Sequence, residues 1–100
     1  MKFYKTETAR GFELIQFHDD NHELCDMQRS SSADKDKIWL GLHNVYPKIL
    51  ASKTEQGGTG WVEYEIPSDV FINTRMHLTR KQSISLALKL LKFGLLNKIR

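Results

Sequence analysis

Two histidines and the single cysteine of the chain stand close together in the sequence. His18, His22 and Cys25 lie within eight residues, with carboxylates between them, and residues of these types bind zinc or support thiol chemistry. Their spacing matches no standard zinc module, and a hairpin turn would direct the side chains to different faces. A thiol on an apolar strand also lacks the neighbouring base that a nucleophile needs. We therefore favour a polar turn with a buried cysteine, and rank a small metal- or thiol-dependent enzyme third among the functions.

Sequence motifs of the common enzyme classes are absent. The chain has no Gly-x-Ser-x-Gly, no His-Glu-x-x-His, no phosphate-binding loop and no dinucleotide fingerprint. The glycines of residues 56–60 do not join a strand to a helix, so we do not expect them to cradle a phosphate. The sequence predicts a protein that is not an enzyme and has no metal or cofactor.

A better candidate site lies where basic residues open a predicted helix. Arg80 and Lys81 would fall in the first turn, where positive charge opposes the helix dipole unless an anion or a carboxylate compensates. The free amides of a helix N-terminus also favour anions. The residues predicted to form this anion-binding edge are Arg75, His77, Thr79, Arg80 and Lys81, with the hydroxyl groups of Ser30 and Ser31. The alternative is that Arg75 pairs with an acid such as Asp69, that His77 is an ordinary edge histidine and that the serines only shape a turn.

Four further residues are candidates for contacts with partners. Lys89 and Lys92 lie on the basic face of the predicted helix and could follow the phosphates of a nucleic acid, or could simply keep that face hydrated. Trp39 and Trp61 are large apolar anchors, which in a small domain belong more often to the core than to an interface. Small α+β domains can also complete their cores by pairing, so a homodimer is a further hypothesis.

The elements that would position these residues follow from the hydrophobic pattern. Residues 11–28 are predicted to form a hairpin of two strands around a polar turn. Residues 38–42, 61–66 and 75–78 are predicted to form further strands. Thr79 and Gln82 can form a capping box, which predicts a helix over residues 79–93 with a stop at Gly94 or Asn97.

The predicted helix carries an apolar stripe that we expect to dock on the sheet. Ile84, Leu88, Leu91 and Leu95 recur at spacings of three and four, which places them on one side. The fold class predicted is α+β, a mostly antiparallel sheet of four or five strands with one C-terminal amphipathic helix packed on it.

Length and composition set the remaining limits. One hundred residues suit a single domain spanning residues 1–100, and one cysteine excludes an internal disulfide and favours a reducing compartment. No apolar run approaches the roughly 20 residues of a membrane span, so we expect a soluble cytoplasmic protein without a membrane partner. The net charge of +3 selects no partner, but all seven basic residues from Arg75 onward stand in a segment without acids.

Several short motifs together resemble a known group of proteins. They are Arg10-Gly11-Phe12, Cys25-x-x-Gln28-x-Ser30-Ser31, Ile38-Trp39-Leu40-Gly41, Gly60-Trp61-Val62 and Thr74-Arg75-Met76-His77-Leu78-Thr79. In these motifs the chain resembles a family of small uncharacterised proteins of phages and prophage-bearing bacteria, although Ser32 stands where an aliphatic residue is expected. The resemblance implies a phage accessory protein in the cytoplasm of the infected bacterium, in a class that includes inhibitors of anti-phage defence.

Three functions follow in order of preference. The first is a non-catalytic binding protein that occupies a host protein or sequesters an anionic ligand, with a nucleotide among the candidates, at the edge from Arg75 to Lys81. The second is a nucleic-acid-binding module that uses the basic face of the helix. The third is the metal- or thiol-dependent enzyme around His18, His22 and Cys25.

Overall fold

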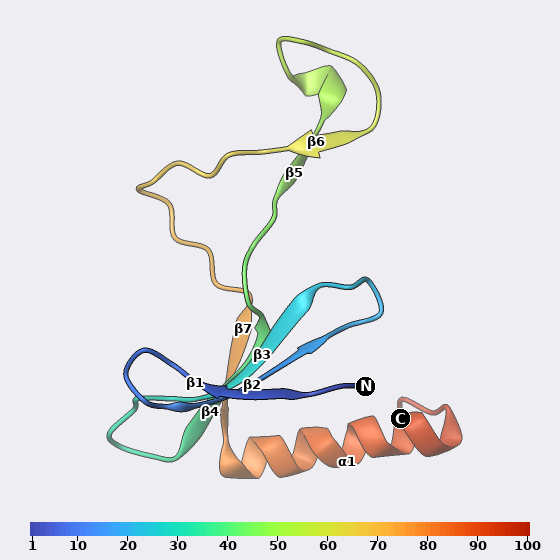
Figure 1. Ribbon diagram of the computed structural model, residues 1–100. Coiled ribbons are helices and arrows are strands. Elements are labelled where there is room, and N and C mark those ends of the chain that lie inside the picture. The colour runs from blue at the N-terminus through green and yellow to red at the C-terminus, as the bar shows by residue number, and fades with distance from the viewer. The chain divides into compact units, whose positions relative to one another are not determined.

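The computed structural model describes all 100 residues as seven strands, one α-helix and one short 3-10 helix (Figure 1). The elements are β1 (Tyr4–Glu7), β2 (Glu13–His18), β3 (Leu24–Arg29), β4 (Lys37–Leu42), β5 (Lys48–Leu50), η1 (Ala51–Lys53), β6 (Trp61–Glu63), β7 (Arg75–Thr79) and α1 (Arg80–Leu96). The chain divides into two compact units, a sheet unit of Met1–His43 with Arg75–Arg100 and a hairpin unit of Asn44–Thr74. The α+β class is confirmed, and the single domain stays a prediction.

The sheet unit is built on five antiparallel strands in the order β1-β2-β3-β4-β7. Residues opposite one another in an antiparallel pair point to the same side, and successive residues alternate. The register therefore defines an apolar face and a polar face. The apolar face carries Ile15, Phe17, Cys25, Met27, Ile38, Leu40, Leu42, Met76 and Leu78. The polar face carries Gln16, Asp26, Gln28, Trp39, Arg75 and His77.

The predicted hairpin over residues 11–28 is confirmed as β2 and β3. Their turn is closed by Asp19, whose Oδ1 accepts from the backbone N–H groups of Asn21 and Glu23, each at 2.9 Å. His22 takes a left-handed conformation with φ of 63°, which a short turn of this kind requires. The turn thus uses carboxylate and backbone groups to reverse the chain.

The helix begins and ends where its sequence signals lie. Thr79 Oγ1 accepts from Gln82 N at 3.2 Å and Gln82 Oε1 accepts from Thr79 N at 3.0 Å, so the predicted capping box is confirmed. The helix continues past Phe93 to Leu96 and stops at Asn97, which has φ of 55°. Of the two predicted stops, Asn97 is the one used. No helix combines the length and hydrophobicity that crossing a bilayer requires.

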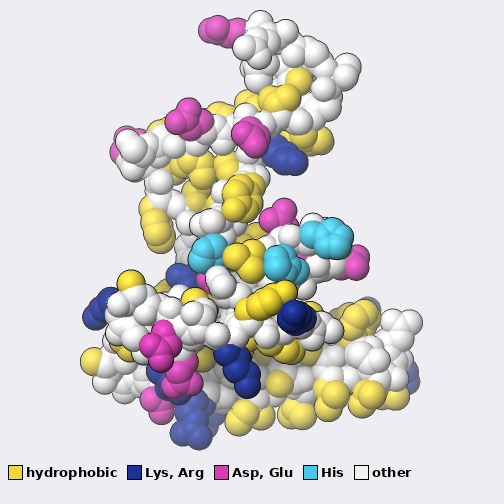
Figure 2. Space-filling view, in the orientation of Figure 1, with side chains coloured by type: hydrophobic (Ala, Val, Ile, Leu, Met, Phe, Trp, Pro, Cys, Tyr) yellow, Lys and Arg dark blue, Asp and Glu magenta, His cyan; other side chains and the backbone are white.

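The apolar stripe of α1 is not covered as the sequence led us to expect. Ile84, Leu88, Leu91 and Leu95 are 62%, 62%, 57% and 73% exposed, and α1 buries none of its residues. Figure 2 shows hydrophobic side chains in a row along the helix. The stripe stays exposed because α1 follows β7 without a loop and contacts the sheet mainly at that edge strand. The expectation that this stripe docks on the chain's own sheet was therefore wrong.

The hairpin unit contains a two-stranded antiparallel sheet, β5 with β6. Its one buried side chain is Ala51, 3% exposed. The predicted strand over residues 61–66 ends at Glu63. Tyr64 N still donates to Pro47 O at 3.0 Å, but proline has no N–H to return the second bond of a ladder pair, so the pairing stops there.

Candidate functional site

A connected group of polar and aromatic side chains lies on the polar face where β4 meets β7. Trp39 and His77 are direct partners in the register of these strands. Their rings are parallel, with an interplanar angle of 6° and centroids 3.9 Å apart. The guanidinium carbon of Arg75 lies 5.4 Å from the Trp39 ring centroid, within the range of a cation–π contact. An aromatic stack and a permanent positive charge therefore share one surface.

Hydrogen bonds from β3 and its following loop hold this group in place. Arg75 Nη1 donates to Gln28 Oε1 at 3.0 Å. His77 Nε2 is 2.8 Å from Ser30 Oγ, which also accepts from Ser32 N at 3.1 Å. We call these residues the Trp39 cluster, and its members are Gln28, Ser30, Trp39, Arg75 and His77. Each polar side chain has a partner that fixes its orientation, which is the arrangement that a preformed binding surface needs.

The chemistry of the Trp39 cluster suits a ligand with a planar ring and a negative charge. Nucleobases stack on aromatic side chains and on guanidinium planes, at about 1–3 kcal/mol per base. A guanidinium also forms two parallel hydrogen bonds with a phosphate or a carboxylate. His77 is exposed, so the ring that stacks on Trp39 is itself reachable from solvent.

A second polar group on the same face is centred on a buried carboxylate. Asp26 is 2% exposed, and its two oxygens lie 3.1 Å from Gln16 Nε2 and 2.6 Å from His43 Nδ1. The sequence alone does not reveal this group. The one signal was an aspartate inside a strand, a position that aspartate usually avoids. Because both carboxylate oxygens have partners, the group can stabilise the sheet without a ligand.

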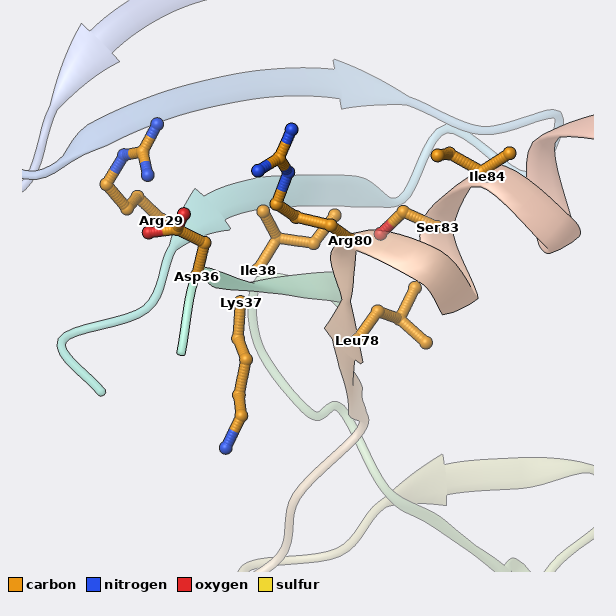
Figure 3. A pocket seen from close by; sticks show the side chains of 8 residues that line it. All are labelled: Arg29, Asp36, Lys37, Ile38, Leu78, Arg80, Ser83 and Ile84. Carbon is orange, nitrogen blue, oxygen red and sulfur yellow. The ribbon is translucent and has the colours of Figure 1, made fainter. Parts of the chain in front are cut away.

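Arg80 lies in a different place, in a hollow on the side of the apolar face. The hollow has a volume of about 570 Å³, and Figure 3 shows the side chains of Arg29 and Arg80 pointing to one side and Lys37 to the other. It is lined by Arg29, Asp36, Lys37, Ile38, Leu78, Arg80, Ser83 and Ile84. Arg29 also forms an exposed ion pair with Glu13 at 3.3 Å. Acids therefore offset part of the positive charge here.

Lys81 lines a smaller hollow beside the first one. Its volume is about 420 Å³, and it is lined by Lys35, Asp36, Thr79, Arg80 and Lys81. Here too an acid stands among the cations. Asp36 lines both hollows, so one carboxylate stands among the first-turn cations Arg80 and Lys81.

The structure thus divides the predicted anion-binding edge. Arg75, His77 and Ser30 come together on the polar face, whereas Arg80 lines the hollow on the other side. Side chains alternate between the two faces along β7, which places Arg75 and His77 together on the polar face. The helix follows β7 directly, and Arg80 in its first turn lies on the other side. Thr79 uses its hydroxyl as the helix cap.

The remaining predicted residues lie outside the Trp39 cluster. Ser31 is exposed in the loop after β3, Lys89 is exposed and Lys92 half-buried on α1. Trp61 belongs to the hairpin unit and is 65% exposed. The stacking of Trp39 on His77 was missed because it depends on which distant strands pair, and no local pattern reports that.

The segment around Cys25 shows no arrangement for metal or thiol chemistry. Cys25 is 8% exposed, and its thiol contacts the carbonyl of Glu23 at 3.6 Å. Burial raises the pKa of this thiol, and the nearby carboxylates of Asp19 and Asp26 raise it further. No three side chains among the histidines, cysteine, aspartates and glutamates are grouped so as to hold a metal ion. Burial and a raised pKa make the thiol of Cys25 less reactive.

The fold and the site define a class: an antiparallel sheet with one helix, whose polar face carries an aromatic and guanidinium cluster suited to planar anions. No protein family, curated protein or solved structure matches this chain.

Proposed function

We propose that this chain is a non-catalytic binding protein that captures an anionic ligand with a planar ring, a nucleotide, on the Trp39 cluster. The observation that carries the proposal is the parallel stack of His77 on Trp39 with the Arg75 guanidinium beside it. The ring system would receive the base, and the guanidinium would receive a phosphate. Sequestration needs only affinity, so no catalytic group is required.

The biological setting that we propose rests on the sequence motifs. The motifs around Gln28, Trp39 and Arg75 resemble those of a family of phage and prophage proteins. The residues of the Trp39 cluster lie within these motifs. A phage accessory protein that removes a nucleotide signal in the cytoplasm of an infected bacterium would inhibit a host defence factor that depends on that signal. In the alternative, this protein would inhibit the host defence factor by binding directly to a host protein.

Nucleotide titration followed by tryptophan fluorescence tests the proposal. In a Trp61→Phe background, Trp39 is the one remaining tryptophan, so its emission reports on the cluster alone. We expect nucleotides to quench this emission with saturation. Arg75→Gln and His77→Ala should weaken binding by at least about tenfold, which corresponds to roughly 1.4 kcal/mol for each lost contact.

Arg80→Gln is the matched control, because it removes the same charge from the other side of the sheet. We expect it to leave the affinity within about threefold of the parent protein. If Arg75→Gln and Arg80→Gln weaken binding equally, the ligand responds to net charge and the Trp39 cluster is not its site. If no nucleotide binds and a host protein is retained through His77 and Arg75, the inhibitor acts by occupying that protein.

A second candidate function is nucleic-acid binding by α1. The segment from Arg75 to Arg100 has seven basic residues and no acid, so polyphosphate binding with a steep salt dependence is the expected signature. Lys89→Gln and Lys92→Gln should each reduce that salt dependence by about one counterion. Binding of duplex or single-stranded DNA that is insensitive to both substitutions would exclude this function.

A further inference from the structure

A second group of aromatic and cationic side chains lies on the polar face, on the side of β1 and β2. The register pairs Tyr4 with Gln16, and His18 follows Gln16 by one alternation, so Tyr4 and His18 share the face of the Trp39 cluster. Their rings meet edge to face, with centroids 6.4 Å apart and an interplanar angle of 89°. Lys2 Nζ lies 5.2 Å from the Tyr4 ring centroid. We call Lys2, Tyr4 and His18 the Tyr4 group.

The Tyr4 group repeats the composition of the Trp39 cluster. Each contains a large aromatic ring, a histidine ring in contact with it and a cation within cation–π range of it. Tyr4 is 46% exposed and His18 is exposed, so a planar ligand can reach these rings from solvent. Nucleobases stack on aromatic side chains whatever the base. The Tyr4 group can therefore receive a base of its own.

One line of directly paired residues crosses the sheet between the two groups. It consists of Tyr4, Gln16, Asp26, Gly41 and Arg75, one from each strand. Gly41 has no side chain, and the Arg75 side chain reaches across β4 beside it to Gln28 on β3. The guanidinium therefore lies inward from the edge strand, towards the Tyr4 group, where it can bind a phosphate between two bases.

His43 adds a hydrogen-bonding group to the middle of the same face. The Asp26 carboxylate only accepts, so His43 Nδ1, 2.6 Å away, donates to it. A neutral imidazole held in this way keeps an acceptor at Nε2. The His43 side chain is 40% exposed, so a sugar hydroxyl group can donate to this nitrogen from solvent. The region between the two aromatic groups thus offers a cation for phosphate and an acceptor for sugar.

The separation of the two aromatic groups limits the kind of ligand that can contact both. Tyr4 and Trp39 lie on β1 and β4, three strand spacings apart in the sheet. With about 4.8 Å between strands and about 3.3 Å per residue along them, the two residues are roughly 16 Å apart. Stacked neighbouring bases of a strand are about 3.4 Å apart, too close to contact both groups. A ligand that uses both groups must hold two rings well apart.

We propose that the polar face binds a dinucleotide in an extended form, with one base on the Trp39 cluster, the other on the Tyr4 group and the linking phosphates beside Arg75. The inference rests on the proposed function and names the ligand class of that site. Because the two bases belong to one molecule, the second contact adds affinity at a high effective concentration.

Titration of the Trp61→Phe chain with two ligands tests the proposal. Adenosine monophosphate offers one base, and diadenosine diphosphate joins two such units through their phosphates. We expect the dinucleotide to bind at least about tenfold more tightly than the mononucleotide. Equal affinities would leave a site for one base and overturn the dinucleotide proposal, while the proposed function stands. Absence of binding by both ligands would overturn the proposed function as well.

Substitutions in the Tyr4 group locate the second base. Tyr4→Leu and His18→Asn should each weaken the dinucleotide by at least about fivefold and leave the mononucleotide within about twofold of the parent protein. His22→Asn is the matched control, because it makes the same change in the adjacent turn, where asparagine accepts the left-handed conformation. Equal losses in His18→Asn and His22→Asn would overturn the assignment of the second base to the Tyr4 group.

Short single-stranded oligonucleotides separate a free dinucleotide from a nucleic acid. A site with two ends is filled by two bases, so the affinity per molecule should not rise further when the strand is lengthened. An affinity that keeps increasing with strand length, together with a steep salt dependence, would show that the face follows a nucleic-acid strand and would overturn the proposal.

Discussion

The imidazole of His77 lies flat on the indole of Trp39, with ring centroids 3.9 Å apart and an interplanar angle of 6°. Stacking of two rings adds about 0.5–1.5 kcal/mol beyond the area that it buries. His77→Ala should therefore lower the free energy of unfolding by about 1 kcal/mol, as measured by urea denaturation. His77→Phe keeps a ring on Trp39 and should recover most of that loss, even though it cannot bond Ser30. Equal losses in both variants would show that the hydrogen bond, and not the stack, stabilises this contact.

The second prediction concerns the buried carboxylate of Asp26. Asp26→Ala leaves Gln16 Nε2 and His43 Nδ1 without their acceptor, and a buried polar group left unpaired costs about 1–3 kcal/mol. The His43 side chain is 40% exposed and can bond water instead, so we expect the free energy of unfolding to fall by about 1–2 kcal/mol in chemical denaturation. Asp20→Ala removes an exposed turn carboxylate and should stay within about 0.5 kcal/mol of the parent protein. A small effect of Asp26→Ala would mean that the pairing only offsets the cost of burying the charge.

The sequence predicted the elements better than the site, and the reason is the range of the interactions. The strands β2, β3, β4 and β7 and the start of α1 follow local signals, namely short apolar and aromatic runs, a polar turn and a capping box. Strand β1 was missed because the segment Tyr-Lys-Thr-Glu has no apolar alternation, and it is held by pairing with β2. Ser30 and His77, 47 residues apart, meet only because β4 pairs with β7. Pairing at this distance has no local signature.

The third prediction is a low pKa for Asp34. The hydroxyl of Ser32 donates to Asp34 Oδ1, and the ammonium group of Lys37 lies 3.3 Å from the same oxygen. These hydrogen bonds favour the ionised form and lower the pKa of Asp34 from 3.8 to about 2. Because the folded-state pKa is depressed, any stability from these contacts is present above pH 3.8 and is lost as the pH falls towards 2.

A carbon-detected NMR titration measures the Asp34 pKa directly. Ser32→Ala removes the largest single cause and should raise the pKa towards its ordinary value, and Lys37→Met should also raise it. Arg29→Met removes a cation that pairs with Glu13 instead and should leave the Asp34 titration unchanged. A pKa near 3.8 in the parent protein would mean that the loop after β3 does not hold these contacts in solution.

The last prediction concerns the start of α1, on which the position of the apolar stripe depends. Thr79 is both the last residue of β7 and the helix cap, so the strand passes into the helix without a loop. Thr79→Ala removes the acceptor for Gln82 N and should lower the free energy of unfolding by about 1 kcal/mol. Thr79→Ser keeps the hydroxyl and should have a much smaller effect. Hydrogen exchange of the Gln82 amide should accelerate in Thr79→Ala alone, and equal protection in both variants would show that packing, rather than the cap, holds the first turn.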